Sequence, residues 1–312
     1  MARVLPCCRE LPACRAAGGF PSRTSLRAFR RARNPARKNS VLNNFTQQII
    51  EEFRANAGRV GGPFDGARLL LLTTTGARFG KPHTTVLGYY PDTADRVLVV
   101  GSAGGGAKHP DWYHNLLANP RATVETGVFT YEAEALVLRD AERHETFARL
   151  AEADPGWAEY QSKTTRIIPV VALTQVAGGP PNAGSFGAAL RLIHGAFRRE
   201  LALVRREVAS SGPGIGAQLR INCLTLCRGL HIHHTFESGG LFPSMLERHP
   251  ELAATITTLE AEHAKIAGLL EALQTLVSTP STTSVLAAVD ELITELTQHL
   301  DYEEEQLIPL LD

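Results

Sequence analysis

Histidines interrupt the apolar faces of four predicted helices in the last part of the chain. Between residues 187 and 312, apolar residues recur at steps of four and three, which places them on one face of each helix. Such a face normally packs into a core, yet each one carries a histidine, and two carry a glutamate one turn later. The ligand-type residues are His194 on the first helix, His233 and Glu237 on the second, His263 on the third, and His299 and Glu303 on the fourth.

Ionisable side chains in a core need partners, because burying each of them alone costs several kcal/mol. A metal cation is the simplest partner, and the helix lengths bring the groups together. His194 lies about 16 residues before the turn at 210–216 and His233 about 17 after it, so both reach one level of an up-down bundle. Histidines with carboxylates that can bridge suit iron or manganese, and six ligands fit two ions better than one.

Short runs around these ligands add a second signal: LHIHHTFE at 230–237, LFP at 241–243, Glu262-His263, and HLDYEE at 299–304. They resemble the hemerythrin-like HHE cation-binding family over residues 186–312. The resemblance implies an all-α up-down four-helix bundle whose six ligand residues hold a non-haem di-iron centre. Ala267 stands where oxygen-carrying hemerythrins have a second histidine, which argues against reversible oxygen storage. His231 and His234 could supply an extra ligand, but each lies about 100° or more around the helix from His233, so we expect a flank or surface role.

The preceding part, residues 41–176, contains short strand-like segments and few helices, which argues for a small antiparallel barrel. We therefore expect an α+β multidomain fold in which a barrel precedes the bundle of residues 187–312. Gly178 to Asn182 form a natural linker within residues 177–186. Strands are predicted at 67–74, 83–90, 96–101, 122–126, 131–138 and 168–175, and helices at 43–57, 111–117 and 141–153.

Two loops of this barrel carry chemical groups. Thr73 to Lys81 combine hydroxyls, glycines and two cations, a composition suited to holding phosphate. Gly101 to Pro110 allow the backbone to approach a ligand closely and precede a helix N-terminus that favours anions. Either could equally be a plain loop with solvated charges. No GxGxxG follows a strand, which excludes a Rossmann dinucleotide site.

The order of motifs across the barrel resolves these alternatives. The motifs are FRAN at 53–56, GGPF at 61–64, TTG at 74–76, HPDWYHNLLANP at 109–120, YQ at 160–161 and TRIIPV at 165–170. They closely resemble the deazaflavin-dependent nitroreductase family over residues 42–176. The resemblance implies a split β-barrel of the flavin-reductase type that binds coenzyme F420. It also implies hydride transfer to a quinone or a nitro compound, for which the barrel positions the ring and excludes water.

The resemblance also assigns site residues. Arg78 and Lys81 are expected at the phosphate and polyglutamate tail, and residues 102–108 around the deazaflavin. Tyr160 and Trp157 are expected at the acceptor pocket, although both aromatics also suit a core. His83 replaces a usual arginine and Phe79 a small hydroxyl residue, which leaves FMN as the alternative cofactor. The expected cofactor-binding residues are Thr75, Gly76, Arg78, Lys81, His83, Ser102, Ala103, Gly104, Lys108, Trp112 and Asn115, and the expected catalytic residues are Tyr160 and Ser102.

The overall composition argues against a nucleic-acid-binding protein and against a membrane-spanning one. The chain has 32 basic and 32 acidic residues, which gives no electrostatic case for nucleic acid, and no apolar run approaches the about 20 residues that span a bilayer. Residues 1–40 hold nine arginines and a lysine against Glu10, so we expect a disordered tail, either transit-like or the product of a start codon placed too far upstream. The cysteine spacing fits no disulfide framework, so a reducing, cytoplasmic location is the default, with peripheral membrane contact only through lipophilic quinones.

We interpret the chain as an F420H2-dependent quinone or nitro-compound reductase fused to a non-haem di-iron bundle. The alternative is a sensor or binding protein in which the barrel is degenerate or binds FMN, and the bundle reports oxygen, nitric oxide or iron. The intact glycine loop favours the enzyme, whereas His83 and Phe79 favour the alternative.

Overall fold

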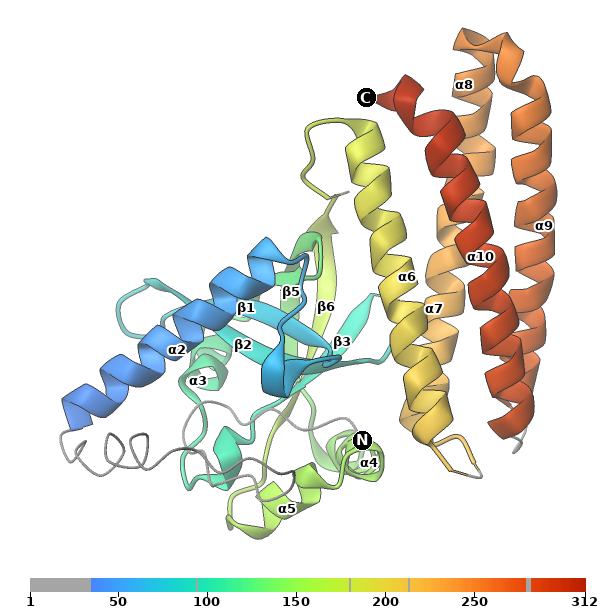
Figure 1. The fold of residues 1–312 in the computed structure, drawn as a ribbon. Helices are drawn as coiled ribbons and strands as arrows, with labels where there is room; N and C mark the ends of the chain where they lie inside the picture. Colours follow the sequence, from blue (N-terminus) through green and yellow to red (C-terminus); the bar gives the residue numbers. More distant parts are fainter. Residues whose placement is uncertain (1–34, 94, 180, 213, 279–281) are drawn as a thin grey trace, which may run out of the picture.

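The computed structural model describes residues 35–312 except residues 94, 180, 213 and 279–281. Figure 1 shows a barrel of strands surrounded by short helices, and beside it a bundle of long helices that includes the C-terminus. The predicted α+β multidomain architecture is therefore confirmed. None of the helices in the described ranges combines the length and apolar character needed to span a bilayer.

Six antiparallel strands close into a barrel in the order β1-β2-β3-β6-β5-β4. The register places Leu70 of β1 opposite Leu87 of β2, and Leu72 opposite Val124 of β4. Every strand lies within three residues of its predicted bounds, because apolar runs bounded by turn residues mark strands well. The strands are β1 (Leu69–Thr75), β2 (Pro82–Pro91), β3 (Arg96–Val100), β4 (Arg121–Thr126), β5 (Phe129–Val137) and β6 (Val170–Gly178).

The sequence of β1 shows that this strand is covered on both sides. Its leucines form a continuous run instead of alternating with polar residues, a pattern typical of strands buried on both faces. Leu70 and Leu72 belong to the interior of the barrel, whereas Leu69 and Leu71 pack outside it against Phe53. Phe53 lies on α2 (Pro35–Ala55), which crosses the outside of the barrel in Figure 1.

Helix α2 is longer than predicted. It begins at Pro35, whereas the sequence predicts a helix from Asn43. Proline suits the first turn of a helix because the missing N–H has no intrahelical partner there. Residues 35–40 of the predicted disordered tail are therefore helical, and residues 1–34 of that tail lie outside the described residues.

Short helices complete the barrel and position its loops. Phe147, Leu150 and Trp157 pack on the outer faces of β3 and β6, next to Leu98 and Val170. The loop after β3 therefore lies beside a helix instead of in open solvent. The short elements are η1 (Gly62–Phe64), η2 (Ala103–Gly105), α3 (Asp111–Ala118), α4 (Asp140–Ala153) and α5 (Gly156–Ser162).

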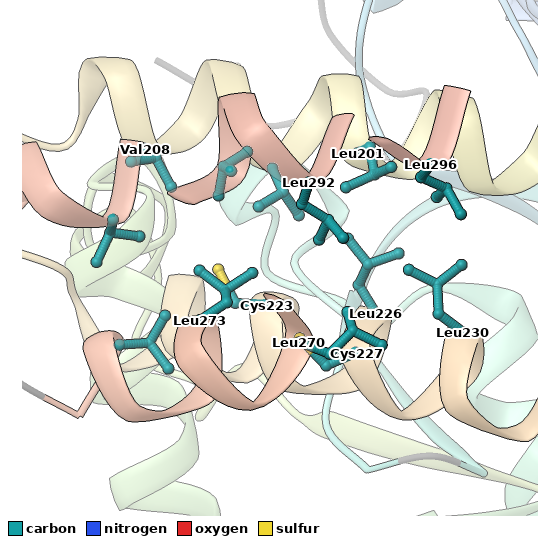
Figure 2. Close-up of a cluster of buried hydrophobic side chains, with 14 of the residues drawn as sticks. Leu201, Val208, Cys223, Leu226, Cys227, Leu230, Leu270, Leu273, Leu292 and Leu296 are labelled. Atoms are coloured by element: carbon teal, nitrogen blue, oxygen red, sulfur yellow. The ribbon is translucent and has the colours of Figure 1, made fainter. Parts of the chain in front are cut away.

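The second part is an up-down bundle with two apolar cores along its length. Figure 2 shows one of them, in which Leu201, Leu226, Leu273 and Leu292 come from four different helices and point toward one another. The other core surrounds Phe242 near the opposite end of the bundle. The elements are α6 (Phe186–Ser210), α7 (Ala217–Phe236), the π-helical segment η3 (Glu237–Leu241), α8 (Phe242–Arg248), η4 (Pro250–Leu252), α9 (Ala253–Leu276) and α10 (Thr282–Leu311).

Polar contacts join the bundle to the barrel where α6 and α7 face it (Figure 1). Arg68, at the start of β1, is buried and pairs with Glu200 at 2.5 Å and with Glu207, both on α6. The amide of Gln218 on α7 donates to the carbonyl oxygen of Pro91 at 2.7 Å. A charged barrel residue is thus neutralised by carboxylates of the bundle, so the packing of the two parts is specific.

Candidate metal centre and cofactor loops

The ligand-type residues of the bundle gather in one layer between the two apolar cores. On every long helix the ligands fall between residues of one core and residues of the other, as His263 does between Leu259 and Ile266. The layer is dry, because the side chains of the six predicted ligands are at most 8% exposed. The residues that the structure brings together are His194, His233, Glu237, His263, His299 and Glu303.

A seventh residue, His234, joins this layer, so its predicted flank or surface position is wrong. It is buried, whereas His231 is exposed as expected. The sequence prediction compared the direction of His234 around the helix with that of His233 alone. Glu237 lies about 40° from His233 and about 60° from His234 on the other side, at about 100° per residue. Both histidines therefore flank the glutamate and face the same centre.

The seven residues form two groups that share one carboxylate. His234, Glu237, His263 and His299 make one group, in which the ligand atoms lie within 4.8 Å of one another. The second group has the same spacing and consists of His194, His233, Glu237 and Glu303. Glu237 belongs to both groups, so its two oxygens can bridge two cations.

The distances between the ligand atoms match those expected for ligands that bind the same metal ion. His263 Nε2 and His299 Nε2 lie 3.1 Å apart, and His233 Nε2 lies 3.1 Å from Glu237 Oε1. Two ligands that are each about 2.1 Å from a metal and at right angles to each other lie about 3 Å apart. In the second group, His194 Nε2 is 3.5 Å from Glu303 Oε2, close to the 3.6 Å between His263 Nε2 and Glu237 Oε2 in the first group.

Outer partners orient three of the imidazoles. His194 Nδ1 lies 3.0 Å from Glu304, and His299 Nδ1 lies 2.9 Å from Glu262. His263 Nδ1 lies 2.9 Å from the hydroxyl of Ser238. A proton on Nδ1 satisfies each carboxylate and leaves the Nε2 lone pair directed at the centre, the arrangement common for metal-bound histidine.

Unsatisfied atoms show that the layer fits cations. Among the described residues, Nε2 of His194, His233 and His234 and all four carboxylate oxygens of Glu237 and Glu303 are buried without a hydrogen-bond partner. Burial lowers the pKa of His233 to about 2, which keeps this ring neutral, as a metal ligand must be. Burial and then the neighbouring Glu303 raise the pKa of Glu237 well above its usual range. Two positive ions would satisfy these atoms together.

The helix that carries Glu237 changes its winding at this residue. Residues 237–241 form a π-helical turn, and the Glu237 N–H donates to the carbonyl oxygens of both His233 and His234. Single π-turns inside α-helices occur often at functional sites. Here the turn begins at Glu237, which carries the shared carboxylate. It includes Ser238, whose hydroxyl lies 2.9 Å from His263 Nδ1.

At the barrel, the first predicted loop is an exposed turn between β1 and β2. The Gly76 N–H donates to the Lys81 carbonyl oxygen at 2.8 Å, which closes the turn. A Cβ at Gly76 would lie 2.9 Å from His83 Nε2 and 3.0 Å from the Lys81 carbonyl oxygen, so a larger residue there would displace the His83 side chain. The side chains of Thr75, Arg78, Lys81 and His83 are exposed, and Phe79 is 83% exposed. The cations are therefore available to an anionic ligand.

Asn115 links this turn to the helix that follows the glycine loop. It lies on α3, is buried, and accepts a hydrogen bond from the Ala77 N–H at 3.0 Å. Its amide also donates to the Thr74 hydroxyl at 3.0 Å. The predicted cofactor-binding role of Asn115 stays a prediction, and these contacts show that Asn115 holds the turn between β1 and β2. Trp112, one turn earlier, lies in the barrel core with only 3% exposure.

The glycine loop after β3 is held by Arg166, a residue that sequence reasoning did not single out. Its guanidinium donates to the carbonyl oxygens of Gly101 at 3.1 Å, Ser102 at 2.5 Å and Gly106 at 2.8 Å. It also lies 3.0 Å from His109 Nδ1. Only the TRIIPV motif marked Arg166 in the sequence, because contacts across 57 to 65 residues leave no local pattern.

The same loop packs against α5 and its tyrosine. A Cβ at Gly105, whose φ is +79°, would lie 2.9 Å from the Tyr160 carbonyl oxygen, so only glycine fits. The Ser102 hydroxyl is buried and accepts from the Gly104 N–H at 3.4 Å, which shapes the turn through Ala103. Lys108, at the end of the loop, is exposed.

Two aromatic residues of α5 have different surroundings. Trp157 is buried in the core, and its indole N–H donates to the Tyr90 hydroxyl at 2.8 Å. Tyr160 is only partly buried and lies next to the glycine loop. Burial raises the pKa of Tyr160, so its hydroxyl stays protonated at neutral pH. Of the two predicted acceptor-pocket residues, Tyr160 therefore offers a group at the surface.

Known proteins resemble each part of the chain separately. Residues 46–175 match the family model described as F420H(2)-dependent quinone reductase, and residues 186–311 match the model described as hemerythrin HHE cation binding domain. An F420H(2)-dependent quinone reductase of Mycobacterium tuberculosis strain H37Rv is 39% identical over 127 residues, which cover 39% of this chain and 85% of that protein. An F420H(2)-dependent quinone reductase of strain CDC 1551 matches with the same identity and coverage.

A solved structure of an F420-H2 dependent reductase (FDR-A) is 38% identical and covers 34% of this chain and 93% of that chain, with a TM-score of 0.31. The curated relatives are covered over most of their length by the barrel part of this chain. The chain therefore belongs to the F420H(2)-dependent quinone reductase family, and its reductase part is followed by a hemerythrin HHE cation binding domain.

Proposed function

We propose that the barrel binds coenzyme F420 at its two loops and uses reduced F420 to reduce a quinone. Residues 41–176 would form this reductase unit, residues 177–186 a linker, and residues 187–312 the metal-binding unit. The observation that carries the proposal is the braced glycine loop, in which Arg166 holds three carbonyl oxygens beside Tyr160. The name of the relative from M. tuberculosis supports F420 as the cofactor and a quinone as the acceptor.

The roles of individual residues follow from their positions. Reduced F420 supplies a hydride, and a proton completes the reduction of the two quinone carbonyls to the two hydroxyls of the quinol. The protonated hydroxyl of Tyr160 would donate a hydrogen bond to one of these acceptor oxygens and orient the ring. Arg78 and Lys81 would bind the phosphate and the acidic tail, while Ser102 shapes the loop over the deazaflavin. A nitro compound offers similar oxygens and is proposed as a second acceptor class.

The bundle is proposed to hold two non-haem iron ions. His234, Glu237, His263 and His299 would bind one ion, and the second group of ligands the other, with Glu237 between them. A set of imidazoles and carboxylates without thiolates suits iron or manganese better than structural zinc. Bound iron would supply redox chemistry and a site for oxygen or nitric oxide. The seven buried atoms without hydrogen-bond partners support this assignment.

Anaerobic oxidation of F420H2 by menadione, followed by absorbance, tests the reductase proposal. We expect turnover by the wild type, and we expect Tyr160→Phe to change the KM or kcat for the acceptor while the affinity for F420 stays the same. Tyr302→Phe, in the bundle, is the matched control and should leave both unchanged. Wild-type protein that does not oxidise F420H2 above background would exclude the activity, and tighter binding of FMN than of F420 would reassign the cofactor.

A further inference from the structure

A cavity of about 530 Å³ lies between the barrel and the bundle. Arg68, Tyr89 and Tyr131 line it from the barrel, and residues of α6 and α7 close it from the other side. None of the residues proposed to bind F420 or metal lines this cavity. Its volume falls within the range of about 300–1,000 Å³ that small-molecule sites occupy. The fold therefore contains a third space of ligand size.

Aromatic rings dominate the apolar part of the wall. Tyr89 comes from β2, Phe129 and Tyr131 come from β5, and Phe197 comes from α6. Burial raises the pKa of Tyr89 to about 12, so its ring carries no charge at neutral pH. Rings from opposite walls can enclose a flat or apolar body, which is the usual way in which proteins bind aromatic ligands.

Four arginines and two acids, Asp95 and Glu200, line the cavity, so its wall carries more positive than negative groups. Arg68 is matched by Glu200 and Glu207, and Arg191 by Asp312. Arg199 has a different kind of partner, because its guanidinium contacts only the carbonyl oxygens of Ala57 and Ala67 within the described part of the chain, both at 3.4 Å.

A second cation lies beside it. Arg59 also lines the cavity, and its guanidinium donates to the carbonyl oxygen of Asn56 at 3.3 Å. Burial lowers the pKa of Arg199, Tyr89 and Glu200 act against this shift, and Arg59 and Arg68 add to it. Arg59 and Arg199 both line the cavity, and neither donates to a carboxylate in the described part of the chain, so together they form a favourable place for an anion.

We propose that this cavity is a second ligand site, separate from the cofactor loops and the metal layer, for a small organic anion with an aromatic body. A carboxylate or sulfonate would lie at Arg59 and Arg199, and the ring would pack between Tyr89, Tyr131 and Phe197. Phe197 also contacts His233, with ring centroids 5.1 Å apart. One side chain thus separates the proposed ligand from the metal layer.

Two fluorescent probes of nearly the same shape test the proposal. One is 1-anilinonaphthalene-8-sulfonate, which is an anion, and the other is N-phenyl-1-naphthylamine, which lacks the sulfonate. We expect the anion to bind the full-length protein at least about tenfold more tightly than the amine, a difference of about 1.4 kcal/mol. Arg199→Gln and the exposed variant Arg59→Gln should each remove most of this difference without weakening the amine.

A variant that fills the cavity locates the site. No atom lies within 4 Å of a Cβ built at Gly195, a helix glycine that lines the cavity, so Gly195→Leu adds volume without a clash. It should weaken both probes at least about tenfold. Gly268→Leu is the matched control, because Gly268 is an exposed helix glycine with equally open surroundings on α9. This variant should bind both probes like the wild type.

Each alternative outcome overturns a stated part of the proposal. Equal binding of the two probes, or no effect of Arg59→Gln and Arg199→Gln, means that the cavity does not recognise anions. Unchanged probe binding by folded Gly195→Leu means that the probes bind elsewhere. F420 affinity should be unchanged in Gly195→Leu, and its loss would assign the cavity to the cofactor. That titration keeps this proposal distinguishable from the reductase proposal.

Discussion

The imidazole of His234 stacks on that of His263, with ring centroids 4.2 Å apart and planes 18° from parallel. This contact joins α7 to α9, in which Ala267 stands one turn after His263. His234 therefore brings a fifth histidine into the layer from the neighbouring helix. The layer thus takes two adjacent histidines from α7 and one from α9.

The ligand role of His234 predicts a change in metal content. His234→Ala should lose at least one of about two iron ions per chain, because its group then keeps only three ligands. His231→Ala is the control, since this histidine lies on the same helix and is exposed. Metal analysis after anaerobic iron loading measures both variants. Full retention of iron by His234→Ala would show that the seven-residue ligand set is wrong.

The shared carboxylate predicts opposite effects on the metal-free and metal-loaded protein. Glu237 is completely buried, and its oxygens have no hydrogen-bond partner in the described structure. The metal-free wild type must either bury the charge of Glu237 or take up a proton on folding, because burial raises the pKa of this group. Glu237→Gln avoids this cost, so the metal-free variant should melt at a higher temperature than the metal-free wild type. The variant should gain less from iron, because a bound ion stabilises only the folded state. Calorimetry with and without iron checks the crossover, and a variant stabilised by iron as strongly as the wild type would contradict it.

The brace formed by Arg166 predicts a loss of cofactor affinity without unfolding. Arg166→Gln loses most of the hydrogen bonds to the glycine loop, each worth about 1 kcal/mol, so the affinity for F420 should fall at least about tenfold. Arg166→Lys should not restore it, because one ammonium group cannot reach three carbonyl oxygens in the geometry of a guanidinium. Arg121→Gln serves as the control, since Arg121 is 59% exposed and pairs only with Glu134 in the described structure. Fluorescence titration measures affinity, and a thermal melt confirms folding. Wild-type affinity in Arg166→Gln would remove the loop from the cofactor site.

The bundle thiols predict a pH dependence. Cys223 and Cys227 are completely buried among leucines (Figure 2). Burial raises the pKa of Cys223 from 9.0 to about 12 and that of Cys227 to about 11. The unfolded chain loses these protons near pH 9, so above pH 9 the folded state holds more protons and the free energy of unfolding decreases as the pH rises.

Alkylation measures the state of these thiols directly. At pH 9, iodoacetamide should leave Cys223 and Cys227 unmodified in the native protein and should modify both in urea. Peptide mass spectrometry distinguishes the two positions, and glutathione in the same reaction gives the rate of an exposed thiol. Modification of native Cys223 at that rate would contradict the burial described here.

Periodicity predicted most of the metal layer because each ligand lies on a core-facing stripe of its own helix. His233 and Glu237 are four residues apart, so their shared direction could be calculated without knowing the partner helices. The position of His234 depended on where the centre lies relative to Glu237, which only the packed bundle determines. Around the helix, His233 and His234 point to either side of the direction of Glu237. This adjacent pair of histidines was the sequence signal that could have indicated the position of His234.

The barrel was predictable at the level of strands and loops but not of contacts. Apolar runs such as the leucines of β1 fixed the strands within a few residues. The brace from Arg166 to Gly101 joins residues 65 positions apart, and no local pattern encodes such a contact. Phe197 also fitted the heptad stripe of its helix, yet it lines the cavity next to the barrel. A stripe predicts burial without specifying what covers it.

The pairing of Arg68 with Glu200 has a consequence for the synthesis of the chain. The two residues are 132 positions apart, but the last barrel strand ends at Gly178, and Glu200 follows it by 22 positions. At about 5–20 residues per second, the barrel strands are complete roughly 1 to 4 seconds before the carboxylate that neutralises this guanidinium. During that interval the guanidinium of Arg68 has no carboxylate of the bundle to pair with, and it must stay in water until the first bundle helix is made.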